Sequence, residues 1–221
     1  MAALAATLLC YYDEETTFIM LVRLWELRGL GKLYEPGFRG LMEALDEFEN
    51  KWLKGGVVSQ QLEKLGIEAT AYGTKWYLTL FNYSIPFPAQ LRVWDVFMLL
   101  GDPESLPASP RHSGFAGLHF SHQKIENDEA SGSIGLVGTL DIIHATSAAL
   151  IDGMKEILLQ ADFETAMKML TSWIPVKDEE LLMKVAKTEW KAKRRRRPFG
   201  GAQNTGVGPT SPATSQHRTR I

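Results

Sequence analysis

The segment YGTKWYLTLFNYSIPFPAQLRVWDVFMLLGD, residues 72–102, carries the strongest fold signal in the chain. Large apolar residues recur at three- and four-residue steps in its first half, as on one face of a helix: Tyr72, Trp76, Leu80 and Tyr83. Pro86 and Pro88 follow, and a proline inside a helix removes a backbone donor and breaks it. The second half is again apolar. This stretch therefore predicts two largely buried helices joined by a proline-stiffened corner.

The same residues carry a longer pattern, W-[FY]-x-T-L-F, a short turn with proline, then L-R-[VI]-W-D-x-F. This pattern resembles the Trp-Asp signature of the TBC domain, and the resemblance covers most of residues 1–175. The resemblance implies an all-α, TBC-type helical domain that activates GTP hydrolysis by Rab-type small GTPases. The signature residues, which we expect to have structural roles, are Trp76, Phe81, Arg92, Trp94 and Asp95.

Arg92 and Asp95 stand three positions apart on the otherwise apolar second helix. An ion pair is natural at this spacing, and a charge buried there without a partner would be strongly destabilising. We expect a buried Arg92–Asp95 pair that locks the packing of the helix. The alternative is that these two side chains contact the GTPase directly.

The resemblance also implies two catalytic groups, an arginine finger in I-x-x-D-x-x-R and a glutamine finger in Y-x-Q-G. Neither motif occurs in this sequence, and the opening MAALAATLLCYY resembles the segment that comes directly after the glutamine motif in the family. We therefore expect the C-terminal part of a TBC domain, incomplete at its N-terminus, with no catalytic residue to assign. Such a chain is a GTPase regulator, not an enzyme, and we expect it to be inactive alone.

Helix start and stop signals recur along the chain. Asp13 is placed to cap a helix that Gly29 ends, and Asp162 and Asp178 are placed to cap two later helices. An apolar face runs between Pro36 and the Gly55-Gly56 pair and predicts one continuous helix: Phe38, Leu41, Met42, Leu45, Phe48 and Trp52. A short helix is expected over 57–65, and another begins near Leu140.

These signals divide the chain into segments. Residues 1–175 form the TBC portion, interrupted by an irregular insert at 103–138 that is rich in proline and glycine and has no apolar period. A charged C-terminal helix follows at 176–197. Residues 198–221 contain Gly, Pro, Ser and Thr without an apolar core, which predicts a disordered tail.

Charge is distributed unevenly. Residues 1–192 hold 17 Lys and Arg against 26 Asp and Glu, whereas 193–221 hold seven against none. A basic run of this kind attracts polyanions, and here an acidic membrane surface is a more natural partner than nucleic acid. The alternative is a solvated helix end. The run consists of Lys193, Arg194, Arg195, Arg196 and Arg197.

Other chemistries find little support. The single cysteine, Cys10, excludes an internal disulfide and a cysteine-rich metal site. His119 and His122 lie in the irregular insert and are expected to be loop histidines, while His144 on an apolar helix is expected to be a hydrogen-bonded core residue. We expect no metal and no cofactor. Residues 1–12 are too short a charge-free run to span a bilayer, and they are expected to form a core helix.

The sequence is thus interpreted as part of a GTPase-activating protein that regulates vesicle traffic through a GTP-bound Rab-type GTPase. Its expected location is the cytoplasm, including the periphery of membranes. The alternative function is a non-catalytic helical module that binds a Rab or a scaffold.

Overall fold

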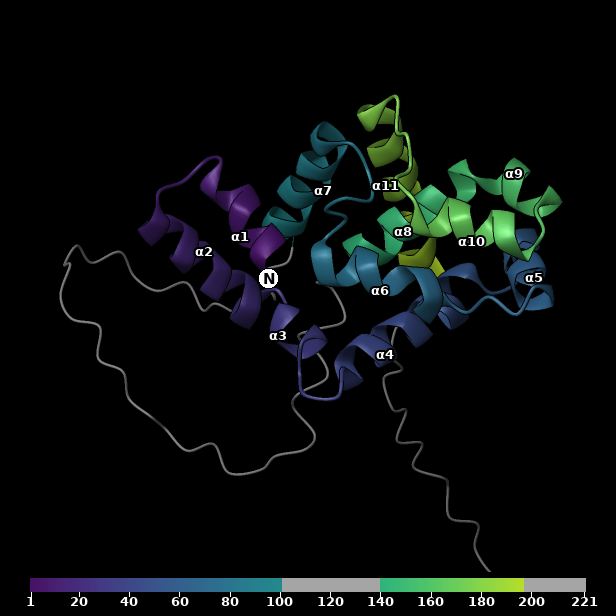
Figure 1. The fold of residues 1–221 in the computed structure, drawn as a ribbon, viewed down its shortest axis with the longest axis horizontal. Coiled ribbons are helices and arrows are strands. Elements are labelled where there is room, and N and C mark those ends of the chain that lie inside the picture. The colour runs from purple at the N-terminus through teal and green to yellow at the C-terminus, as the bar shows by residue number, and fades with distance from the viewer. Residues whose placement is uncertain (101–139, 197–221) are drawn as a thin grey trace, which may run out of the picture.

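A computed structural model describes residues 1–100 and 140–196, and in these ranges every regular element is a helix (Figure 1). The elements in chain order are α1 (Ala2–Leu9), α2 (Glu14–Leu27), α3 (Leu30–Leu33), α4 (Arg39–Glu47), η1 (Phe48–Leu53), α5 (Val57–Lys64), α6 (Ala69–Thr79), α7 (Phe87–Leu100), α8 (Asp141–Gly153), α9 (Lys155–Gln160), α10 (Phe163–Thr171) and α11 (Glu179–Arg196). The all-α prediction is confirmed. The expected insert at 103–138 and tail at 198–221 lie outside the described residues.

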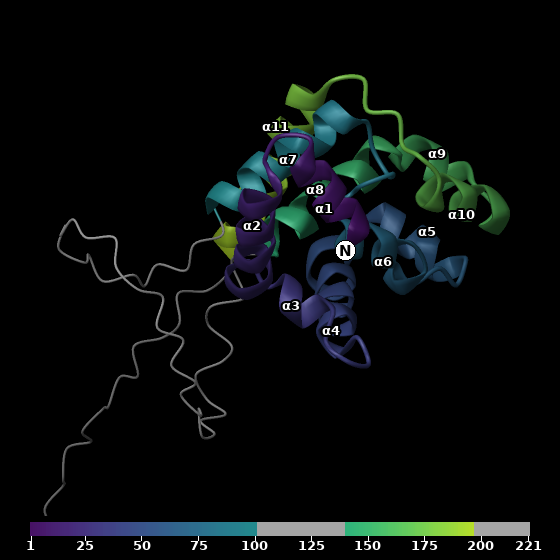
Figure 2. The same cartoon turned by 60° about the vertical axis from the view of Figure 1, so that its left-hand side comes forward.

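The helices pack around a buried centre. Figure 1 shows α1 and α2 at one end and α5, α9 and α10 at the other, with α6, α7, α8 and α11 between them; Figure 2 gives the turned view. Helix α8 is the most enclosed element, because every residue from Asp141 to Ile151 is buried. Helix α11 packs along α8 and α7 and contributes Leu182 and Ala186 to the core. The charged C-terminal helix is therefore part of the packed structure.

The predicted helix caps are present. The carboxylate of Asp13 accepts a hydrogen bond from the backbone N–H of Thr16 at 2.7 Å, and Asp162 accepts one from Thr165 at 2.9 Å. Asp178 caps α11 in the same way. The backbone hydrogen bond from Thr16 holds the pKa of Asp13 below its ordinary value. These caps satisfy donors that the first turn of a helix leaves without intrahelical partners.

The helix predicted over 38–52 is not a uniform α-helix. It begins as α4 and widens into the π-helix η1 at Phe48. The wider turn brings two rings of the same helix against His144: Phe48 stacks parallel to it with centroids 6.2 Å apart, and Trp52 lies at 5.5 Å. Such π-turns carry no distinctive residue spacing, so the apolar period alone could not reveal this one.

Helix α6 ends earlier than the sequence predicted. It stops at Thr79, and Leu80, Phe81 and Tyr83 all have positive φ, at 47°, 65° and 60°. The expectation that Tyr83 continues the buried face is wrong, since its side chain is 69% exposed. A non-glycine residue in the left-handed region is uncommon, so three within four positions require tertiary contacts that hold them there.

Candidate functional site

The aromatic residues of the signature form a buried cluster at the corner between α6 and α7. Trp76 and Phe81 are fully buried, with ring centroids 6.1 Å apart, and Trp94 is almost fully buried. The indole N–H of Trp94 donates to the backbone oxygen of Leu80 at 2.8 Å. That bond crosses from α7 to the left-handed turn, so the cluster fixes the direction in which α7 leaves the corner.

The corner is also tied to distant parts of the chain. The backbone oxygen of Ser84 accepts a hydrogen bond from the N–H of Ile174 at 2.7 Å. The side-chain amide of Asn82 donates from Nδ2 to the backbone oxygen of Ala3 at 3.1 Å, and its Oδ1 accepts from the hydroxyl of Thr7 at 3.3 Å. These hydrogen bonds hold α1 and the segment before α11 against the corner. The outer face of α7 therefore has a fixed position relative to both segments.

Arg92 and Asp95 lie on that outer face and do not form the predicted buried pair. Asp95 is exposed, and the Arg92 side chain is 49% exposed and donates from Nη2 to the carboxylate of Glu180 on α11. This hydrogen bond, with the Glu180 charge behind it, raises the pKa of Arg92; the more distant Asp95 carboxylate adds a smaller effect. The prediction was wrong because Val93 and Trp94 take the inward positions, which turns 92 and 95 toward solvent.

A hollow of about 490 Å³ lies beside this pair, and we term it the α7 hollow. It is lined by Arg92, Asp95, Val96, Met98, Leu99 and Met183. Leu99 is 75% exposed, which is high for a large apolar side chain on a packed helix. The α7 hollow thus combines apolar and charged side chains, as protein-binding surfaces do.

Helix α2 ends next to the α7 hollow, because the guanidinium of Arg28 donates to the backbone oxygen of Met98. The outer side of α2 exposes Phe18, Ile19 and Val22. The sequence did not single out these residues, since apolar residues occur all around α2 and periodicity could not assign the exposed side. Glu180 and Leu99 were missed as well. Their roles depend on the contact between α7 and α11.

The predicted polyanion-binding run is described only at its first residue. The Lys193 ammonium donates to the backbone oxygen of Lys51 and lies 5.8 Å from the centroid of the Trp52 ring. Lys193 is therefore turned onto the body of the molecule. The side chains of Arg194, Arg195 and Arg196, and the whole of Arg197, lie outside the described residues.

The predicted core histidine is confirmed. His144 is 1% exposed, and its Nδ1 lies 2.6 Å from the hydroxyl oxygen of Tyr77, a hydrogen-bond distance. Burial is the main reason that the pKa of Tyr77 is raised well above its ordinary value. His119 and His122 lie outside the described residues. Within the described ranges, no group of three or more His, Cys, Asp or Glu side chains is placed to hold a metal ion.

The N-terminal segment and the possibility of a membrane-spanning helix were also addressed by the sequence. The core helix expected over residues 1–12 is present only over Ala2–Leu9, where α1 buries Leu4 and Leu8; Tyr11 and Tyr12 lie beyond its end and are exposed. Across 1–100 and 140–196, none of the helices has the length and apolar character needed to cross a bilayer.

Comparison with known proteins supports the family resemblance that the signature carries. A family model, the Rab-GTPase-TBC domain, matches residues 1–108. The TBC domain-containing protein C1778.09 of Schizosaccharomyces pombe is 36% identical over 190 residues, which are 86% of this chain and 38% of that protein. GTPase-activating protein GYP5 of Saccharomyces cerevisiae is 35% identical over 103 residues, 46% of this chain and 12% of GYP5.

A third relative matches most of the chain at lower identity. Rab GTPase-activating protein tbc-11 of Caenorhabditis elegans is 27% identical over 179 residues, 80% of this chain and 15% of tbc-11. The chain therefore spans well under half the length of each of these three relatives. The two longer alignments extend beyond the 108 residues of the family match.

Proposed function

Because residues 1–108 belong to the Rab-GTPase-TBC domain family, we propose that this chain binds a Rab-type small GTPase in its GTP-bound form. The observation that carries the proposal is the family match itself, which spans α1 to α7 and includes the signature cluster around Trp94. The relatives named as GTPase-activating proteins support the same partner class. The corresponding cellular function is regulation of vesicle traffic from the cytoplasm or from a membrane periphery.

The α7 hollow is the surface we assign to the GTPase. Its two charged signature residues, Arg92 and Asp95, are exposed and do not form the buried ion pair that would stabilise the core. Within the described ranges Asp95 forms no ion pair, and its carboxylate is open to a basic group of a partner. Leu99 next to it supplies an apolar contact. An apolar centre with a polar rim provides both burial and orientation at an interface.

We further propose that binding by this chain does not itself accelerate hydrolysis. Acceleration requires a charge that neutralises the phosphoryl oxygens and a group that orients the attacking water. The family resemblance assigns these tasks to an arginine and a glutamine in two motifs, and this sequence contains neither motif. The chain is then a member of a GTPase-activating family that acts here as a binding partner.

The basic run 193–197 is a second proposed contact, with an acidic membrane surface. Its support is the run of five consecutive cations in a segment without carboxylates. Vesicle flotation with and without an acidic lipid tests it, and attachment should fall steeply as salt is raised. Flotation that does not depend on acidic lipid contradicts this part of the proposal.

The main experiment uses a panel of Rab GTPases loaded with GDP or with a non-hydrolysable GTP analogue. We expect the chain to bind at least one GTP-form Rab more tightly than its GDP form. Leu99→Glu should abolish that binding, whereas Met42→Glu, a matched change at an exposed methionine on α4, should not. Absence of nucleotide-dependent binding across the panel would overturn the proposal.

Single-turnover hydrolysis on the same panel tests the catalytic part. An arginine finger typically raises the hydrolysis rate by about 10³ to 10⁵. Because this chain contains no arginine-finger motif, we expect it to accelerate hydrolysis by less than about tenfold. Greater acceleration would show that another side chain supplies the missing charge. This outcome leaves the binding proposal standing, so the two parts can fail independently.

A further inference from the structure

The guanidinium of Arg92 has three carboxylates around it at the edge of the α7 hollow. It donates to Glu180 on α11, and that hydrogen bond is the largest of the causes that raise the pKa of Arg92. The charges of Asp95 on α7 and Glu179 on α11 raise the same pKa by smaller amounts, and Asp95 has the greater effect of the two. Asp95 is therefore the next carboxylate available to a guanidinium that loses Glu180.

Arg92 and Asp95 are within reach of one another along α7. Side chains three positions apart on a helix are neighbours on its surface, at a spacing where opposite charges pair. Both residues lie on the exposed side of α7, and both line the α7 hollow. Asp95 and Glu180 are thus competitors for one guanidinium, and in the structure Glu180 holds it.

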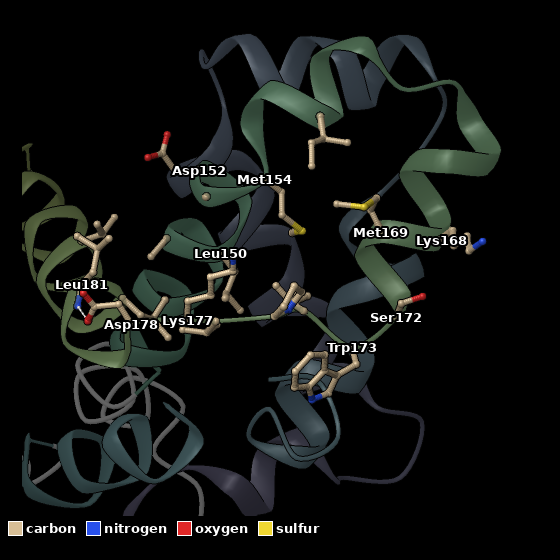
Figure 3. Close-up of a pocket in the computed structure, with 18 of the residues that line it drawn as sticks. Leu150, Asp152, Met154, Lys168, Met169, Ser172, Trp173, Lys177, Asp178 and Leu181 are labelled. Atoms are coloured by element: carbon tan, nitrogen blue, oxygen red, sulfur yellow. Dashed lines mark hydrogen bonds between the residues drawn. The ribbon is translucent and has the colours of Figure 1, made fainter. Parts of the chain in front are cut away.

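The backbone that carries Glu180 is fixed by contacts other than this ion pair. The carboxylate of Asp178 accepts the backbone N–H of Leu181 at 2.9 Å and caps the start of α11 (Figure 3). Leu182 and Ala186 of the same helix are buried in the core. An exposed ion pair adds little to stability by comparison, because solvent screens it. Loss of the ion pair should therefore leave α11 in place.

We propose that Glu180 is a positioning residue for the GTPase contact: it holds the Arg92 guanidinium away from Asp95, which keeps the Asp95 carboxylate open to a Lys or Arg side chain of the GTPase. This inference rests on the proposed assignment of the α7 hollow to GTPase binding. A partner cation can then reach Asp95 without first displacing Arg92. Leu99, one turn further along α7 and 75% exposed, supplies an apolar contact beside that cation.

The size of the effect depends on how much of the time a released Arg92 covers Asp95. When only a fraction of the molecules can bind, the apparent affinity falls by that fraction. Because exposed ion pairs are weak, we expect Glu180→Gln to lower the affinity for a GTP-form Rab by about two- to fivefold. Adding Arg92→Gln to this variant should recover most of the loss, since position 92 then lacks the guanidinium that covers Asp95.

Glu179→Gln is the matched control. It removes the same charge from the adjacent position of α11, so a loss that comes only from weaker long-range attraction to a basic partner would appear in both variants. We expect Glu179→Gln to change the affinity by less than about 1.5-fold, because salt screens such exposed charges. Circular dichroism and thermal melts check that each variant folds like the unsubstituted chain.

Chemical labelling of Asp95 supplies a readout that needs no GTPase. A water-soluble carbodiimide with glycine ethyl ester converts exposed carboxylates into amides, and mass spectrometry of the digested full chain gives the labelling rate at Asp95. The rate should fall about two- to fivefold in Glu180→Gln, by the same covered fraction that lowers the affinity. It should be unchanged in Glu179→Gln and restored when Arg92→Gln is added to Glu180→Gln.

Two outcomes overturn the inference. One is an Asp95 labelling rate that is the same with and without the Glu180 carboxylate, and the other is an equal loss of GTPase binding in Glu180→Gln and Glu179→Gln. If no GTP-form Rab binds the unsubstituted chain, the proposed function fails, whereas the labelling rates still decide whether Glu180 keeps Arg92 away from Asp95. Failure of the inference and failure of the proposed function are therefore distinguishable.

Discussion

Arg92 on α7 pairs with Glu180 on α11, across 88 positions of sequence, and not with Asp95 one turn along its own helix. The pair joins the signature helix to the C-terminal helix at the surface, beside the α7 hollow. It also leaves the Asp95 carboxylate exposed. The two charged residues of the signature thus have different roles: one bridges two helices, and the other is open to a partner.

Asp95→Ala should leave stability nearly unchanged and weaken GTPase binding. An exposed carboxylate without an ion pair among the described residues contributes little to folding. Losing a charge contact at an interface weakens binding, and we expect about tenfold or more. Denaturant melts and binding to a GTP-form Rab measure the two effects, with Glu63→Ala on α5 as the exposed control. A marked drop in the melting midpoint would return Asp95 to a structural role.

Tyr77→Phe should destabilise the fold by about 1–3 kcal/mol, the usual cost of removing one partner of a buried hydrogen bond. The Tyr77 hydroxyl oxygen lies 2.6 Å from His144 Nδ1, and both residues are buried. Tyr83→Phe is the matched control, because the Tyr83 side chain is 69% exposed and should tolerate the loss. Equal unfolding free energies for the two variants would show that the hydroxyl of Tyr77 is dispensable.

Stability should decline in alkaline solution as pH rises above about 10. Burial raises the pKa of both Tyr72 and Tyr77 above the ordinary value of 10.0, with a further contribution from Glu49 at Tyr72. Between the unfolded and folded pKa values the folded state keeps its protons while the unfolded state loses them. The unfolded state is therefore favoured by about 1.4 kcal/mol per pH unit for each tyrosine.

Urea melts at pH values from 8 to 11 measure this dependence. Tyr72→Phe should make the decline less steep than in the unsubstituted chain, since one of the tyrosines whose pKa burial raises, Tyr34, Tyr72 and Tyr77, no longer titrates. A slope unchanged by that substitution would show that the loss of stability comes from other groups.

Gly73→Ala should destabilise the protein although alanine is the better helix former. A Cβ at position 73 of α6 would lie 2.6 Å from Cδ2 of Leu45 on α4, too close for two carbon atoms. Overpacking of this kind costs about 1–3 kcal/mol, more than the gain of up to about 1 kcal/mol in helix propensity. Gly153→Ala is the matched control, because a Cβ there meets no atom within 4 Å.

Thermal or denaturant unfolding of the two alanine variants gives the comparison. Gly153→Ala should be neutral or stabilising by up to about 1 kcal/mol, and Gly73→Ala should fall below the unsubstituted chain. If both are stabilising, the close approach of α4 and α6 is not tight enough to constrain position 73.

Local sequence signals were sufficient to predict most of the helices. The caps at Asp13, Asp162 and Asp178 and the apolar period of α6 act over only a few residues, so they can be recognised without knowing where the chain goes next. The burial of Trp76 and Trp94, expected from their apolar surroundings, follows from the same local pattern. The residue pattern of the signature also carried the family resemblance.

Contacts between distant segments, in contrast, set which charges pair and which surfaces are open. The (i, i+3) spacing made Asp95 an available partner for Arg92, but the folded chain brings Glu180 closer, and no local rule ranks a neighbour on the same helix against one 88 positions away. At the early end of α6, the indole N–H of Trp94 donates to Leu80 from another helix, a contact that no local pattern announces. The hollow of about 860 Å³ that Met154 and Met169 line exists only because α8, α9, α10 and α11 meet there. The sequence pattern shows which positions of a helix are apolar, whereas packing between distant segments decides which of those side chains are covered.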